Sequence, residues 1–70
     1  MKALDYIHGF KPYSRERLGE ASRSEIRRWF DQGAIQVNGE RTEWNEKVED
    51  WTNGVFSLVL FPNGKRVTLL

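Results

Sequence analysis

The chain has 70 residues, which predicts a single domain over residues 1–70. A domain of this length buries only about 60% of the surface that its unfolded chain exposes. Its core is therefore thin, and the length argues against a deep catalytic cavity with a cofactor. The absence of cysteine excludes disulfides and thiolate metal sites, and the single histidine excludes a site built from several histidines.

The charge of the chain is nearly balanced, but it is unevenly distributed. Eleven Lys and Arg against ten Asp and Glu give a formal net charge of +1, which by itself argues against a strongly basic nucleic-acid-binding surface. Residues 1–33 hold seven basic and five acidic side chains, whereas residues 34–70 hold four and five. Because the arginines gather between positions 15 and 28, a local basic face remains compatible with the small total.

The sequence carries no membrane or export signal. No apolar run approaches the ~20 residues that a membrane-spanning helix needs. The N-terminal segment also lacks the apolar stretch of a signal peptide. We therefore expect a soluble, cytoplasmic protein.

The first half of the chain has helical patterns. Leu4 and Ile7 stand at helical spacing, and Gly9 follows as a stop, which predicts a short helix over residues 3–8. A Lys-Pro-Tyr turn comes next. From Ser14 we expect a second short helix, with Leu18 facing inward.

A third helix is predicted over residues 23–32. Ser22 at the N-cap and Glu25 three residues later have the form of a capping box. Gly33 stands where a left-handed residue would end the helix. The apolar positions i, i+3 and i+4 form one stripe, made of Ile26, Trp29 and Phe30.

The second half of the chain has strand patterns. Residues 34–37 alternate in polarity and lead into Asn38-Gly39, the strongest short signal for a tight hairpin turn. The remaining predicted elements are a return strand over 40–43, a strand over 55–61 ended by Pro62, a turn at Asn63-Gly64 and a last strand over 65–70. Helices before strands predict an α+β domain, with two or three short helices packed on a small antiparallel sheet of hairpins.

Residues 22–39, which read SRSEIRRWFDQGAIQVNG, resemble the signature of one RNA-binding family. It is the domain named after ribosomal small-subunit protein S-four. Its signature joins Ser-Arg-Ser, a helix with basic residues, a glycine, and a strand that ends in Val-Asn-Gly. Leu4-Asp5 is similar to the Leu-Asp pair of the family's first helix. The resemblance implies an S-four-like fold with its αL motif, and non-catalytic binding of structured RNA, either rRNA or tRNA.

The resemblance and the arginine pattern together indicate the candidate RNA contacts. A guanidinium group binds phosphate with two parallel hydrogen bonds, and the start of a helix offers free N–H groups. The candidates are Ser22, Arg23, Arg27, Arg28, Lys65 and Arg66. On a helical wheel Arg23 and Arg27 lie on one flank of the apolar stripe, and Arg28 points more nearly opposite. The alternative is a solvated helix face on which Asp31 neutralises Arg27.

The polar segment between the predicted hairpins holds two tryptophans and most of the acidic residues. Trp44 and Trp51 either stack on RNA bases or, as we prefer, cover the thin core from the loop side. The acidic residues have irregular spacing and no nucleophile or histidine partner, which indicates a solvated face. They are Glu40, Glu43, Glu46, Glu49 and Asp50.

Two other functions stay open. Asp31 and Gln36 stand where the family often has basic or aromatic residues, which favours a protein-interaction module that keeps the fold without RNA binding. The tail from Phe56 to Leu70 resembles the closing hairpin of the tRNA-binding domain in bacterial tyrosyl-tRNA synthetases. That likeness implies a domain excised from a tRNA synthetase or an RNA-modifying enzyme. We expect no catalysis by this chain itself, and no cofactor, metal or small-molecule substrate.

Overall fold

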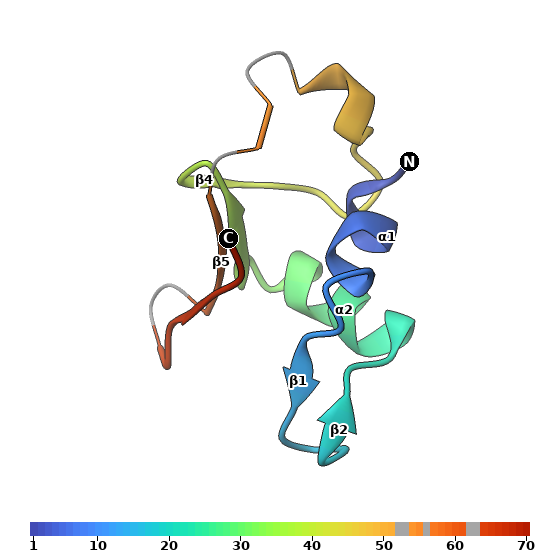
Figure 1. Ribbon diagram of the computed structural model, residues 1–70, viewed down its shortest axis with the longest axis vertical. Coiled ribbons are helices and arrows are strands. Elements are labelled where there is room, and N and C mark those ends of the chain that lie inside the picture. Colours follow the sequence, from blue (N-terminus) through green and yellow to red (C-terminus); the bar gives the residue numbers. More distant parts are fainter. Residues whose placement is uncertain (52–53, 56, 62–63) are drawn as a thin grey trace.

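The computed structural model describes residues 1–51, 54–55, 57–61 and 64–70, and it has the predicted α+β architecture (Figure 1). Its helices are α1 (Ala3–His8), α2 (Arg23–Asp31) and the 3-10 helix η1 (Val48–Asp50). A four-stranded antiparallel sheet has the order β4-β3-β5-β6. Its strands are β3 (Ile35–Val37), β4 (Glu40–Arg41), β5 (Leu58–Leu60) and β6 (Val67–Thr68). A separate two-stranded sheet consists of β1 (Tyr13–Ser14) and β2 (Gly19–Glu20).

Both α-helices and the central strands of the larger sheet share one core. β3 pairs with β5 so that Ile35 lies opposite Leu60 and Val37 opposite Leu58. The fully buried large apolar side chains are Phe30, Ile7, Ile26, Ile35, Leu58 and Leu60. Trp44 and Trp51 are half-buried and pack against this core, so the preferred prediction that they cover it is confirmed. Among the described residues, no helix is long and apolar enough to cross a membrane.

Helix α2 begins and ends close to where the sequence predicts. The Ser22 hydroxyl accepts a hydrogen bond from the Glu25 N–H at 3.2 Å, which satisfies one of the free donors of the first turn. Gly33 follows the helix with φ +71°, a conformation that glycine adopts without steric cost. Only half of the capping box forms as predicted, because the Glu25 carboxylate accepts instead from the Ser14 hydroxyl at 2.7 Å.

Replacing Ser22 with alanine removes this cap and should lower the free energy of unfolding by about 1 kcal/mol. The matched control is Ser24→Ala, since Ser24 lies exposed in the first turn of the same helix. Urea denaturation followed by circular dichroism measures both variants. Equal loss of stability in the two variants would show that the cap does not contribute.

The tight turn after β3 is confirmed. Asn38 and Gly39 have φ values of +54° and +83°, as a two-residue turn of type I′ requires. The later strands are shorter than predicted: β5 covers 58–60 of the expected 55–61, and β6 covers 67–68 of the expected 65–70. The predicted features at Phe56, Pro62 and Asn63 lie outside the described residues.

The prediction of a second helix from Ser14 is wrong. The segment forms the β1–β2 hairpin, in which Tyr13 pairs with Glu20 and Ser14 with Gly19. Leu18 has φ +53° and is 78% exposed rather than facing inward. The Ser14 hydroxyl accepts a hydrogen bond from the Arg17 N–H at 3.2 Å, and such local bonds compete with helix formation.

Candidate nucleic-acid interface

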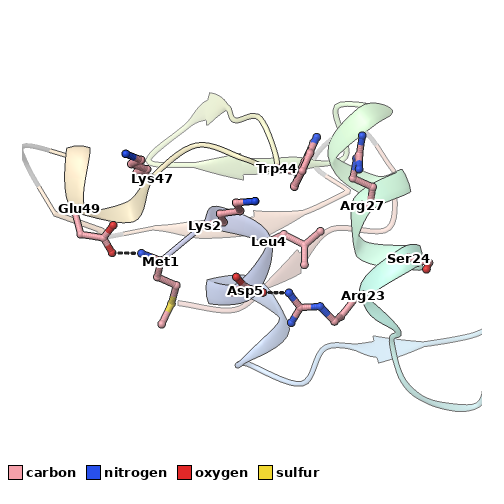
Figure 2. A pocket seen from close by; sticks show the side chains of 10 residues that line it. All are labelled: Met1, Lys2, Leu4, Asp5, Arg23, Ser24, Arg27, Trp44, Lys47 and Glu49. Carbon is pink, nitrogen blue, oxygen red and sulfur yellow. Dashed lines mark hydrogen bonds and ion pairs between the residues drawn. The ribbon is translucent and has the colours of Figure 1, made fainter.

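One flank of α2 borders an open groove of about 740 Å³ (Figure 2). The other walls are the start of α1 and the segment around Trp44. Four basic side chains line this groove, which we call the basic groove: Lys2, Arg23, Arg27 and Lys47. Two acidic side chains also line it, Asp5 and Glu49. The side chains of this one groove therefore carry a local charge of +2, in a chain whose total is +1.

Backbone hydrogen bonds hold the far wall of the basic groove against α1. The N–H groups of Ala3 and Leu4 donate to the carbonyls of Glu46 and Trp44, at 2.7 and 3.0 Å. Lys2 and Lys47 form an isolated antiparallel bridge beside them. These bonds satisfy donors in the first turn of α1 that would otherwise lack a partner, and they fix Lys47 and Trp44 beside the helix.

Trp44 organises two of the cations. The Arg27 guanidinium carbon lies 3.9 Å from the centre of the indole ring, and the Lys2 Nζ atom lies 5.1 Å from it. Figure 2 shows the two side chains on opposite sides of the ring. Both contacts are cation–π interactions, which attract positive charge to the ring face. Trp44 therefore keeps positive groups from two different elements close together.

The groove arginines also contact carboxylates. Arg23 pairs with Asp5, and the Arg27 Nε atom lies 3.7 Å from the Asp31 carboxylate, one helical turn away. The Arg27–Asp31 pair matches the neutralised alternative that the sequence suggests. The side chains of both pairs are substantially exposed, and such surface pairs contribute about 0–1 kcal/mol. A phosphate group can therefore replace either carboxylate at little cost.

Glu49 lies at the edge of the same groove, and the pKa of its carboxyl is lowered. It accepts a hydrogen bond from the Met1 ammonium group, and this contact holds the pKa of the Glu49 carboxyl below its ordinary value. The side chain of Glu49 is therefore a fixed negative charge at neutral pH. Its pairing with Met1 offsets that charge where an anionic ligand would approach.

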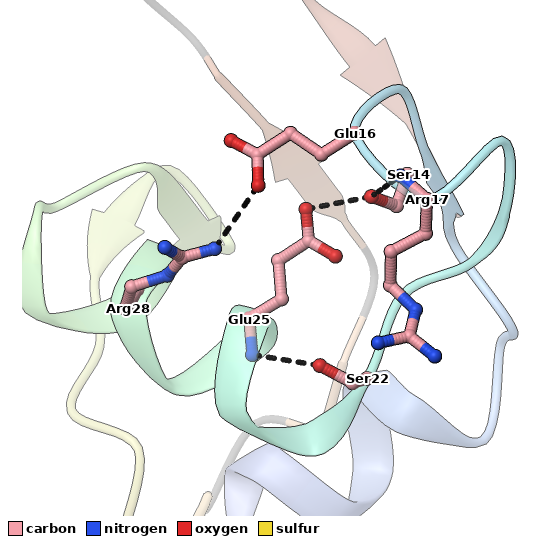
Figure 3. Close-up of polar contacts among 6 residues, drawn as sticks. All are labelled: Ser14, Glu16, Arg17, Ser22, Glu25 and Arg28. Carbon is pink, nitrogen blue, oxygen red and sulfur yellow. Dashed lines mark hydrogen bonds and ion pairs between the residues drawn. The ribbon is translucent and has the colours of Figure 1, made fainter.

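The six residues predicted as RNA contacts fall in different places. Arg23 and Arg27 line the basic groove together, as the helical wheel predicts. Arg28 faces another side of α2 and lies 3.4 Å from the Glu16 carboxylate (Figure 3). Ser22 is half-buried at the start of the helix, where its hydroxyl is used as the cap. Lys65 and Arg66 are exposed between β5 and β6, and neither lines the basic groove.

Sequence reasoning missed two members of the basic groove, Lys2 and Lys47, and favoured only a core role for Trp44. No local signal identifies these three residues, because the groove forms only when the segment before η1 pairs with the start of α1. The acidic residues Glu40, Glu43, Glu46, Glu49 and Asp50 are all exposed, as predicted, but they do not form one face apart from the candidate interface, because Glu49 lines the basic groove. Within the described part of the chain, no three acidic or histidine side chains gather as a metal-binding group.

Searches against family models, curated proteins and solved structures return no match for this chain. The likeness to the S-four family therefore depends on sequence motifs alone, those of residues 22–39 and of Leu4-Asp5.

Proposed function

We propose that this chain binds structured RNA without catalysis, and that the basic groove receives the phosphate backbone. The observation that carries the proposal is the local excess of positive charge around Trp44, with four basic side chains against two acidic ones. The groups come from the N-cap of α1, from α2 and from the segment before η1. Backbone hydrogen bonds join this segment to the start of α1, and the Arg23–Asp5 pair links α1 to α2. A preorganised set of cations binds phosphates without the entropic cost of gathering flexible side chains.

The chemistry of arginine and the form of RNA both support this function. Arg23 and Arg27 present planar guanidinium groups, which bind phosphate through two parallel hydrogen bonds. Double-helical RNA has a deep groove that side chains cannot enter, so proteins read its backbone and shape. The resemblance of residues 22–39 to the S-four signature points to the same class of ligand, rRNA or tRNA. Ser22, Arg28, Lys65 and Arg66 stay predicted contacts outside the groove.

A labelled RNA stem-loop titrated at two salt concentrations tests the proposal. If the four basic groups of the groove each meet one phosphate, raising the salt from about 50 to about 200 mM should weaken binding about 50- to 150-fold. A DNA hairpin of the same sequence serves as the control for shape, and we expect it to bind more weakly. No binding to the RNA at the lower salt concentration would refute the proposed function.

A protein-interaction module is the second candidate, and one observation favours it. Each α2 arginine already contacts a carboxylate: Arg23 with Asp5, Arg27 with Asp31 and Arg28 with Glu16. Pull-down before and after nuclease treatment separates the two functions. A partner that remains after nuclease treatment favours the module, whereas its loss favours RNA binding.

A further inference from the structure

A second groove, of about 410 Å³, lies between the β1–β2 hairpin, α2 and the ends of β5 and β6. Three aromatic side chains line it, together with two cations and two carboxylates: Tyr13, Trp29, Phe61, Arg15, Lys65, Glu16 and Glu25. We call it the hairpin groove. The rings of Trp29 and Phe61 pack edge to face, with centroids 5.1 Å apart. Tyr13 is 63% exposed, which leaves much of this side chain uncovered.

The buried carboxylate of the hairpin groove, Glu25, has an unused acceptor. Glu25 is only 4% exposed, and its Oε2 atom accepts the hydrogen bond from the Ser14 hydroxyl. Its Oε1 atom is buried and has no hydrogen-bond partner among the described residues (Figure 3). A buried acceptor without a partner is destabilising, and in native proteins such groups are rare. The groove therefore offers a ligand one strong acceptor that the fold itself leaves unsatisfied.

The cations of the hairpin groove are also available. Among the described residues, Arg15 and Lys65 form no ion pair, in contrast to the three arginines of α2. Both side chains are exposed, and they come from different parts of the chain. Of the two carboxylates of the groove, Glu16 is paired with Arg28 and Glu25 is buried, so Arg15 and Lys65 are placed to bind an anion at its mouth.

We infer that the hairpin groove binds one unpaired nucleotide, with its base against Tyr13 and its phosphate at Arg15 and Lys65. This inference rests on the proposed function and extends it by naming an unstacked nucleotide as a second contact. An aromatic surface stacks any base, and among the polar groups of a base only the N–H groups can donate to a carboxylate. A purely cationic ligand would satisfy Glu25 but would be repelled by Arg15 and Lys65. A nucleotide matches the aromatic surface, the two cations and Glu25, and the remaining carboxylate, Glu16, is paired with Arg28.

The Glu25 carboxylate also predicts which base the hairpin groove prefers. Guanine presents two adjacent N–H donors on its Watson–Crick edge, whereas the single N–H of uracil lies between two carbonyl acceptors. The Glu25 carboxylate attracts the first arrangement and repels the carbonyls of the second. We therefore expect the hairpin groove to prefer a guanine nucleotide to a uracil nucleotide.

Titration of the full chain with GMP and with UMP, followed by NMR, tests the inference. GMP should bind in a saturable manner, about tenfold more tightly than UMP. Tyr13→Ala should weaken GMP binding about 5- to 150-fold, the range found for loss of a stacked base. Arg15→Gln should also weaken it, whereas Arg17→Gln is the matched control, because Arg17 belongs to the same hairpin and does not line the groove.

Glu25→Gln tests the hydrogen bond directly, since the amide keeps the shape of the side chain and replaces one acceptor by a donor. The preference for GMP over UMP should disappear in this variant. If the variant fails to fold, Tyr13→Ala and Arg15→Gln still decide the question, because both side chains are exposed.

Equal binding of GMP and UMP, no binding of GMP, or GMP binding unaffected by Tyr13→Ala would overturn the inference. Saturable binding of tetramethylammonium instead would identify a site for organic cations. If a stem-loop RNA still binds through Arg23 and Arg27 while GMP fails, only the inference about the hairpin groove is lost. If neither RNA nor GMP binds, the proposed function fails as well.

Discussion

Replacing Phe30 with alanine is expected to leave the protein largely unfolded at room temperature. Phe30 is fully buried at the centre of the core, and loss of such a side chain costs about 3–5 kcal/mol. A single core in a chain of this length rarely supplies more than about 3–5 kcal/mol of net stability. The substitution therefore removes most or all of the free energy of unfolding.

Circular dichroism and urea denaturation measure this effect. The control is Leu18→Ala, because Leu18 is 78% exposed at the tip of the β1–β2 hairpin. We expect the control to change the free energy of unfolding by less than about 0.5 kcal/mol. If Phe30→Ala still unfolds cooperatively, and its free energy of unfolding lies within about 1 kcal/mol of that of the original chain, Phe30 is not a main contributor to the core.

Reversing the charge of Arg23 and Arg27 together is expected to weaken binding of a stem-loop RNA at least about 100-fold. Each arginine supplies a charge-assisted hydrogen bond to phosphate, worth about 1.5–3 kcal/mol, and the introduced glutamates repel the backbone. Both residues lie in the basic groove, and the exposed ion pairs that they lose contribute little to folding. The loss should therefore appear in binding rather than in stability.

The matched control is Lys11→Glu combined with Arg17→Glu, since both side chains are exposed and neither is a predicted RNA contact. This pair changes the net charge by the same amount, but neither residue lines the basic groove. Fluorescence anisotropy of labelled RNA measures both double variants, and circular dichroism confirms that they are folded. An equal loss of affinity in the two variants would show that total charge, and not the basic groove, determines binding.

Local patterns in the sequence predicted α2 and the turn after β3 because local chemistry determines them. Ser22 caps the helix with a bond to a residue three positions away, and the Asn-Gly turn has the positive φ angles that these two residues tolerate. The β1–β2 hairpin escaped prediction for the opposite reason. It is held by Ser14 bonding to Glu25 and by the Ala21 N–H donating to the Pro12 carbonyl, contacts that no helical or alternating pattern reports.

The candidate site also combines residues that a local pattern predicts with residues that only the tertiary fold brings together. Helical periodicity places Arg23 and Arg27 on one flank of α2, which the structure confirms. Lys2, Lys47 and Trp44 join them only because the backbone before η1 pairs with the start of α1. The unused acceptor of Glu25 could not be predicted from the sequence either, because the capping-box pattern assigns its carboxylate to the backbone rather than to Ser14.

The most direct measurement is a map of chemical-shift changes in the full chain as a stem-loop RNA is added. The indole N–H of Trp44 and the backbone amides of Lys2, Arg23, Arg27 and Lys47 should shift together, and their shifts should reverse as salt is raised. The amides of the exposed acidic residues Glu40 and Glu43 should stay in place. Absence of any shift at low salt, or shifts centred on that acidic region while the basic groove stays unchanged, would contradict RNA binding at this groove.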